Sequence, residues 1–301
     1  MMYWLLVIIV AYLFFGFASL CDKLVLNGKA NPKTYTFYVG ISSILVILII
    51  PFVRLGFPGP TGFIFTALDA IVHLAGMYAM FLALRRFDVS RVVATIGATQ
   101  PIFIFILTWL FWGPQLMPLM DILAFILLLI GSIVISIEKN IKITGDYVKI
   151  TIFSSIMFSS DYIFSKFVYL NQPFLQGIIW IRMFVFLFAL LLLIGKNSRK
   201  EIFSGKIISN KKKQTAFLCA QASGWLANFL QSFAISLAPI AFLATVNSLR
   251  GIQYIFLFLM TLFISIFLPK LLKEKLSRRI VLQKVISIFI IAVGLAMLVI
   301  Y

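Results

Sequence analysis

The sequence has 301 residues, of which 62% are apolar, 16% aromatic and only 12% charged. A soluble globular protein needs more polar side chains than this to cover its surface, so the composition excludes that class and indicates an integral membrane protein. The net charge of +17 raises the question of nucleic-acid binding, but the basic residues fall in short connections between apolar runs. His73 is the single histidine, which excludes a histidine cluster for a metal.

Apolar runs of about 20 residues, the length that crosses the hydrocarbon as a helix, follow one another along the whole chain. They occupy 3–20, 34–53, 61–84, 92–112, 118–137, 149–170, 174–195, 214–237, 240–268 and 280–300. The first run lacks a preceding basic region and a cleavage site, so we interpret it as a span and not a signal peptide. The runs do not alternate as barrel strands do. The sequence therefore predicts an all-α integral membrane protein with ten transmembrane helices.

The lysines and arginines are concentrated in alternate connections between these runs. The basic groups lie at 23–33, 85–91, 139–149, 196–213 and 270–284. The opposite side holds only Arg54 and Lys166. Because Lys and Arg are retained on the cytoplasmic side, these connections are predicted to be cytoplasmic and both termini extracytoplasmic, in a cytoplasmic (inner or plasma) membrane. The lysine-rich stretch 196–213 is interpreted as a loop and an orientation signal.

Two stretches in the middle of the chain resemble each other. Residues 94–112 (ATIGATQPIFIFILTWLFW) and 244–262 (ATVNSLRGIQYIFLFLMTL) both begin with Ala-Thr and continue through a polar cluster into a long apolar run. Each is followed by another apolar segment with a late glycine, Gly131 or Gly294. An odd number of spans per half inserts the second half upside down, an arrangement common in secondary transporters. We predict a first five-helix repeat over 1–138 and a second, inverted five-helix repeat over 146–301.

Ionisable residues inside the spans are candidates for ion or proton coupling or for gating, because each is costly in a membrane unless it faces a cavity or a partner. Asp69 and His73 are four positions apart and share one helical face, as either a proton or ligand site or a structural pair. Asp161 has the spacing to pair with Lys166. Lys166 and Lys23 occupy matching positions in the two halves, and either stand at two mouths of a pathway or extend to the membrane surface.

Arg250 is a permanent positive charge well inside the ninth span, and its counterpart in the first half is Gln100. Gly251 and Pro101 beside them loosen the helical backbone, which a membrane tolerates where the segment lines a cavity. A guanidinium without a permanent partner suits an anion, whereas neutralisation by Asp161 or Asp69 suits a zwitterion such as an amino acid. The predicted substrate-binding residues are Arg250 as the anchor, Asn247, Gln100, Asn228 and Gln231 as hydrogen-bonding groups, and Trp225 or Tyr78 as an apolar wall.

Several features of the chain resemble the EamA-like transporters of the drug/metabolite transporter (DMT) superfamily. They are the ten spans in two inverted halves, Ala83-Leu84 ending the third span, Pro101, the late glycines, and LysGluLysLeuSer at 273–277. The glutamate usual after the fourth span of each half is present as Glu274, whereas GlyProGln at 113–115 replaces the first copy. The resemblance implies a central cavity surrounded by spans 1, 3, 4, 6, 8 and 9. It also implies cytoplasmic termini, the reverse of what the basic residues predict.

These observations predict a secondary-active transporter, as an exporter, of a small polar metabolite by alternating access around a central cavity between the repeats. An anionic or zwitterionic substrate is favoured. A multidrug or cation efflux protein is the alternative, although the membrane carboxylate on which the small four-helix type relies is missing from 3–20. A passive channel or structural membrane subunit is a further alternative. No enzyme, cofactor or metal is predicted, and the partners are a small-molecule substrate and the lipid bilayer, with a monomer as the default and a homodimer as the alternative.

Overall fold

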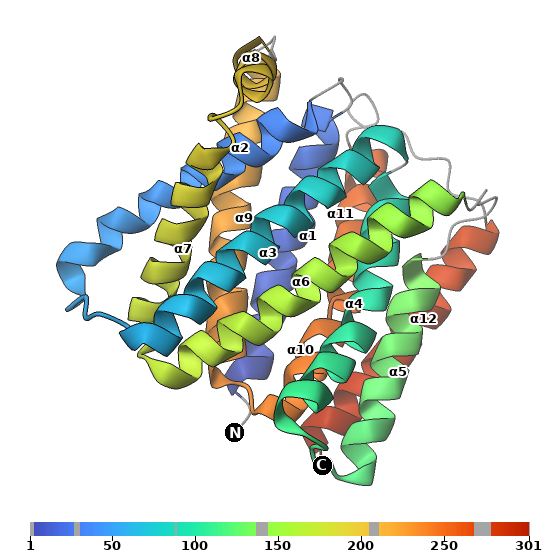
Figure 1. Cartoon of the computed structure of the whole chain (residues 1–301). Helices are drawn as coiled ribbons and strands as arrows, with labels where there is room; N and C mark the ends of the chain where they lie inside the picture. Colours follow the sequence, from blue (N-terminus) through green and yellow to red (C-terminus); the bar gives the residue numbers. More distant parts are fainter. Residues whose placement is uncertain are drawn as a thin grey trace.

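The computed structural model describes residues 3–26, 31–87, 89–136, 144–204, 211–267 and 278–300. Every regular element in these ranges is helical, so the predicted all-α class is confirmed (Figure 1). In chain order the elements are α1 (Tyr3–Leu26), α2 (Pro32–Ser42), η1 (Ser43–Phe52), α3 (Gly59–Arg86), α4 (Val89–Trp112), α5 (Leu119–Ser136), α6 (Gly145–Asn171), α7 (Phe174–Leu191), α8 (Lys196–Ser204), α9 (Lys211–Leu237), η2 (Ile240–Phe242), α10 (Leu243–Ser248), α11 (Gly251–Phe267) and α12 (Arg278–Ile300). The elements η1 and η2 are 3₁₀ helices.

Seven helical stretches among the described residues are long and apolar enough to cross a membrane. They fall in α1, α2 with η1, α3, α4, α7, the run from η2 into α11, and α12. The outer surface exposes large apolar side chains such as Leu48, Leu110 and Phe289, as expected of a surface that faces lipid. The protein is therefore an integral, multi-pass membrane protein.

The three remaining predicted spans also coincide with helices, but these helices are either shorter or more polar than the seven above. The α5 helix is apolar yet short. Helices α6 and α9 have 27 residues each, and α6 carries five serines, whereas α9 carries three serines and three glutamines. Helix α8 was not predicted, because residues 196–213 were interpreted as a loop. It is docked on α2 by an ion pair between Lys33 and Glu201 at 3.1 Å, and this hydrogen-bonded ammonium lowers the pKa of Glu201.

The ninth predicted span is broken in the middle, as the expected loosening at Gly251 requires. The helix stops at Ser248, passes through a turn at Leu249 and Arg250, and restarts at Gly251. Ser132 of α5 donates a hydrogen bond to the carbonyl of Ser248 at 2.7 Å, which satisfies one of the backbone groups at the break. The break places Arg250 on a turn between α10 and α11.

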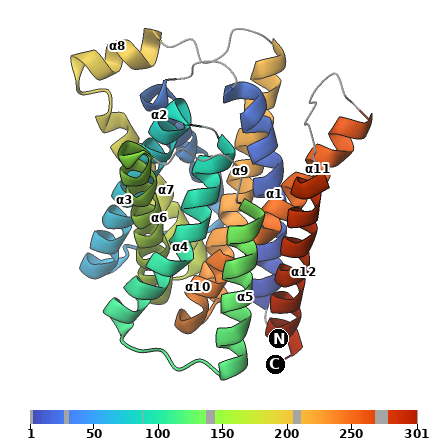
Figure 2. The same ribbon diagram turned by 90° about the vertical axis from the view of Figure 1, so that its right-hand side faces the viewer.

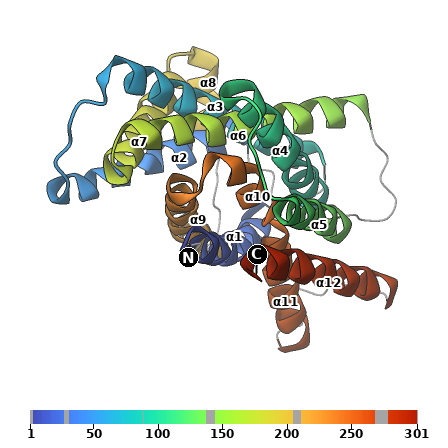
Figure 3. The ribbon, with the colours of Figure 1, turned by 90° about the horizontal axis from the view of Figure 1, so that it is seen from below.

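The most extensive contacts between helices are those of α1 with α9, α3 with α6, and α5 with α12. Viewed along the bundle, α2, α3, α6 and α7 lie on one side and α1, α9, α11 and α12 on the other (Figure 3). The first and last described residues lie at one end, opposite α8 (Figure 2). Gly131 and Gly294 both lie where α5 and α12 touch, since a Cβ atom on either would meet the partner helix within 3.2 Å.

Candidate functional site: a polar cavity between the helix pairs

A cavity of about 250 Å³ lies between the two sides of the bundle. Its walls include all six helices that the family resemblance implies, and also α2, η1 and α7. The α3 residues that line it come from the C-terminal half of that helix, from His73 to Leu84, and the α4 residues from the N-terminal half, from Val93 to Gln100. The cavity therefore extends from the middle of the bundle toward the end at which α8 lies.

Arg250 enters the cavity from the turn between α10 and α11. Its Nη1 donates a hydrogen bond to Oε1 of Gln100 at 2.8 Å, and Gln100 is itself buried at 1% exposure. The hydroxyls of Tyr12, Tyr162 and Tyr254 are its electrostatic neighbours. No carboxylate of the described residues lies within 4.0 Å of the guanidinium, and its Nε is buried without a hydrogen-bond partner there. The positive charge is thus held in place by neutral groups.

Three more of the predicted binding residues line the cavity from α9. They are Trp225, Asn228 and Gln231. Asn228 donates to the carbonyl of Gly224 at 2.8 Å, and Gln231 donates through Nε2 to the hydroxyl of Tyr162, which leaves its Oε1 buried without a partner in the described structure. These three residues follow one another at intervals of three along α9, so they share one face of the helix and lie on one wall of the cavity.

Two predicted binding residues lie elsewhere. Asn247 is completely buried on α10, and neither atom of its side-chain amide has a hydrogen-bond partner among the described residues. It is one turn from Arg250 but does not line the cavity. Tyr78 is 36% exposed on α3 and also lies outside the cavity lining. The structure thus does not bring Tyr78 together with Arg250.

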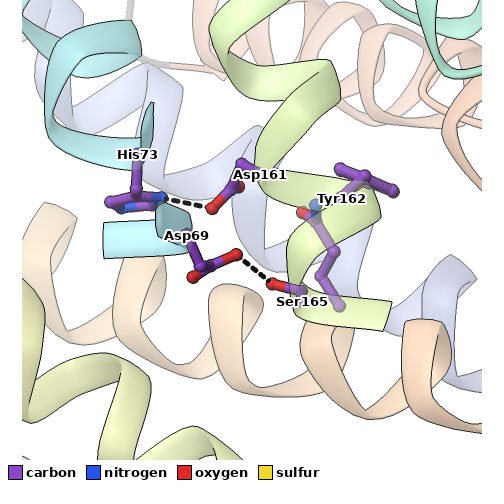
Figure 4. Close-up of polar contacts among 6 residues, drawn as sticks. Asp69, His73, Asp161, Tyr162 and Ser165 are labelled. Carbon is purple, nitrogen blue, oxygen red and sulfur yellow. Dashed lines mark hydrogen bonds and ion pairs between the residues drawn. The ribbon is translucent and has the colours of Figure 1, made fainter. Parts of the chain in front are cut away.

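The acidic residues and the histidine form a cluster between α3 and α6 (Figure 4). Nδ1 of His73 lies 3.2 Å from Oδ1 of Asp161, and both residues line the cavity. Asp69 shares a helical face with His73 as predicted, but its hydrogen-bond partner is Ser165, whose hydroxyl donates at 2.8 Å. The sequence spacing identified the cluster, whereas the partner of His73 comes from 88 residues further along the chain.

Lys166 does not pair with Asp161 and does not extend to the surface. Its side chain is 3% exposed, and its Nζ donates to the backbone carbonyls of Ile235, Ser236 and Ala238 at 3.1, 3.1 and 2.6 Å. These carbonyls belong to the C-terminal end of α9 and the residue after it, so the ammonium caps that helix. The side chain of Lys23 lies outside the described residues.

Arg182 and Tyr162 line the cavity without having been assigned a role from the sequence. Arg182, on α7, forms no hydrogen bond or ion pair with another described residue, although it is an electrostatic neighbour of Asp69. A charged residue inside a membrane span indicates a polar cavity or pathway. By this criterion Arg182 could have been predicted as a cavity residue in the same way as Arg250. Tyr162 carried no such signal, because a single tyrosine in an apolar run is common.

The comparisons with known proteins agree with this architecture. No curated protein sequence matches the chain. The crystal structure of another protein aligns with 97% of this chain and with 94% of its own chain, at a TM-score of 0.66 and 15% sequence identity, and this likeness shows a shared fold alone. Residues 2–137 match the model of the EamA-like transporter family. This N-terminal part of the chain is therefore similar to the EamA-like transporter family.

Proposed function

We propose that the protein is a secondary-active transporter that exports a small anionic or zwitterionic metabolite by alternating access. The observation that carries this proposal is Arg250, a half-buried cation on the cavity wall that is held by the neutral Gln100 and has no carboxylate partner among the described residues. A positive charge in a low-dielectric cavity attracts a carboxylate or phosphate strongly. The cavity volume of about 250 Å³ suits a small molecule.

The pattern of helix contacts supports the inverted repeat on which alternating access depends. If α6 is taken as the counterpart of α1, α9 of α3, and α11 of α4, the contact of α1 with α9 corresponds to that of α6 with α3. In the same way, the contact of α1 with α11 corresponds to that of α6 with α4, and α5 packs against its own counterpart α12. Rocking of one half against the other around a fixed central site is the motion that this symmetry favours.

A multidrug or cation efflux protein is the second candidate, because Asp161 places a carboxylate on the cavity wall among aromatic side chains such as Phe15, Phe81 and Trp225. A cation would be bound by Asp161 and would be repelled by Arg250 and Arg182. Two guanidinium groups against one lining carboxylate favour the anionic or zwitterionic substrate.

The test is a thermal-unfolding screen of the detergent-purified protein with succinate, a sugar phosphate, neutral amino acids and tetraphenylphosphonium. A ligand at 100 times its dissociation constant stabilises the folded state by about 2.7 kcal/mol. We expect stabilisation by members of the first three classes in the parent and in Arg199→Gln, whose side chain is exposed on α8, and loss of it in Arg250→Gln. Stabilisation by tetraphenylphosphonium alone, equal in parent and Arg250→Gln, contradicts the proposal and favours cation efflux.

A further inference from the structure

The cluster of Asp69, His73 and Asp161 lies between α3 and α6, and the side chains of His73 and Asp161 are accessible to water from the cavity. Both side chains line the cavity, and they retain 14% and 18% of their exposure. Their contact, Nδ1 to Oδ1 at 3.2 Å, is compatible with an imidazole that donates to a carboxylate or with an imidazolium ion pair. Imidazole and carboxyl groups side by side are the usual components of a proton-transfer path.

Asp69 belongs to the same cluster but does not line the cavity. It is completely buried, and while Oδ1 accepts from Ser165, its Oδ2 has no hydrogen-bond partner among the described residues. Its charged neighbours are Asp161 and Arg182. An ionised carboxylate with one buried, unpaired oxygen is costly, and a second carboxylate beside it adds repulsion. One proton on the two carboxyl groups relieves both costs, because it removes a charge and supplies a hydroxyl donor.

We propose that Asp69, Asp161 and His73 form a proton-binding site on the wall of the cavity. A proton from cavity water forms an O–H bond with a carboxylate oxygen of the aspartate pair, which raises the charge of the cluster by one. The reverse step returns the proton to water. The role of this site rests on the proposed function, since it makes a proton the coupling ion of the transporter.

Few other ionisable groups lie close enough to this cluster to affect its protonation. Among the described residues, the other titratable groups that face it are Arg182 of α7 and the hydroxyls of Tyr162 and Tyr169 of α6. Lys166 is directed to the end of α9 and contributes no hydrogen bond to the cluster. While the imidazole of His73 is neutral, one guanidinium lies near two carboxyl groups, and the proton neutralises the carboxyl group that has no cationic neighbour.

The experiment is infrared spectroscopy of the purified protein at neutral pH in a detergent without ester groups, in H₂O and in D₂O. We expect the C=O band of a protonated carboxylic acid in the parent, shifted to lower frequency in D₂O because the proton exchanges with cavity water. The band is lost in Asp69→Asn and in Asp161→Asn, and is retained in Asp146→Asn, a matched change at an exposed position at the start of the same helix α6.

Absence of a carboxylic acid band in the folded parent, or a band that persists in both Asp69→Asn and Asp161→Asn, overturns the proposal. If either variant fails to fold, Ser165→Ala provides the same test, since loss of the bond to Asp69 then shifts the band without a change of charge. No substrate is needed, so the result is separate from the ligand screen. If the infrared band behaves as expected but no compound in the ligand screen stabilises the protein, the proton-binding site is supported and the proposed transport function is contradicted.

Discussion

Lys166 is a single residue that joins two helices without an acidic partner. Its ammonium has three donors, and the three carbonyl oxygens at the end of α9 accept all three. A helix C-terminus carries partial negative charge, so the arrangement satisfies both the lysine and the carbonyls in a region from which water is excluded. The residue therefore stabilises the contact between α6 and α9 and is not available as a salt-bridge partner.

Replacement of Lys166 by Met is expected to leave buried carbonyls without a donor, at a cost of about 1–3 kcal/mol. The measurement is the thermal unfolding midpoint in detergent, compared with Lys149→Met, a matched change at an exposed position of the same helix. We expect a lower midpoint for Lys166→Met and little change for Lys149→Met. Equal midpoints in the two variants contradict the capping role.

The same residue shows where prediction from the sequence reaches its limit. The spacing of Asp161 and Lys166 on one helix predicted a pair, but the turn of α6 directs Asp161 to His73 and Lys166 to α9. Which of several polar neighbours a side chain meets depends on helices that are far away in the chain. The place of Arg250 and of the three α9 residues in the cavity lining was predictable, because a charge inside a span and the spacing of residues along one helix are local properties of the sequence.

At the scale of elements, the contact of α5 with α12 depends on two glycines. A Cβ atom on Gly131 would lie 2.6 Å from Cγ1 of Ile291 and 3.2 Å from its backbone nitrogen, so a larger residue must push the helices apart. Small residues that allow close backbone approach are a common device for packing helices in membranes. The two late glycines that marked the repeat in the sequence therefore have a packing role.

Gly131→Ala is expected to destabilise the protein by about 1–3 kcal/mol through overpacking. Gly145→Ala is the matched control, because a Cβ atom there meets nothing within 4 Å at the first turn of α6. Helix propensity favours alanine over glycine by about 1 kcal/mol in a helix interior, so propensity does not explain a loss of stability in Gly131→Ala. Denaturant or thermal unfolding that shows Gly131→Ala to be as stable as Gly145→Ala would rule out the close contact.

At the scale of the whole molecule, the hydropathy of the sequence was sufficient to place the helices, since each predicted span coincides with helix. Hydropathy does not distinguish a 3₁₀ helix from an α-helix, so the winding of η1 was not predictable from it, and the docking of α8 depends on an ion pair with the distant helix α2. The orientation in the membrane is a separate question. The concentration of lysine and arginine predicts that α8 is cytoplasmic and both termini extracytoplasmic.

This orientation predicts the labelling of single cysteines by a membrane-impermeant maleimide in intact cells. In a background with Cys21→Ala and Cys219→Ser, we expect Gln115→Cys, in the connection after α4, to be labelled at once. Lys200→Cys, on α8, is expected to react only after permeabilisation; both native side chains are exposed in the structure. The reverse pattern of labelling would place the termini in the cytoplasm, as the family resemblance implies.

The bond from Ser132 to the carbonyl of Ser248 has a mechanical consequence. It ties the broken helix to α5, which packs along α12 and, like α12, has no side chain in the cavity wall. A displacement of the turn between α10 and α11 must therefore either break this hydrogen bond or move α5 together with the turn. In the rocking motion proposed above, we expect Arg250, two residues after Ser248, to stay with the α5–α12 pair for as long as this hydrogen bond holds.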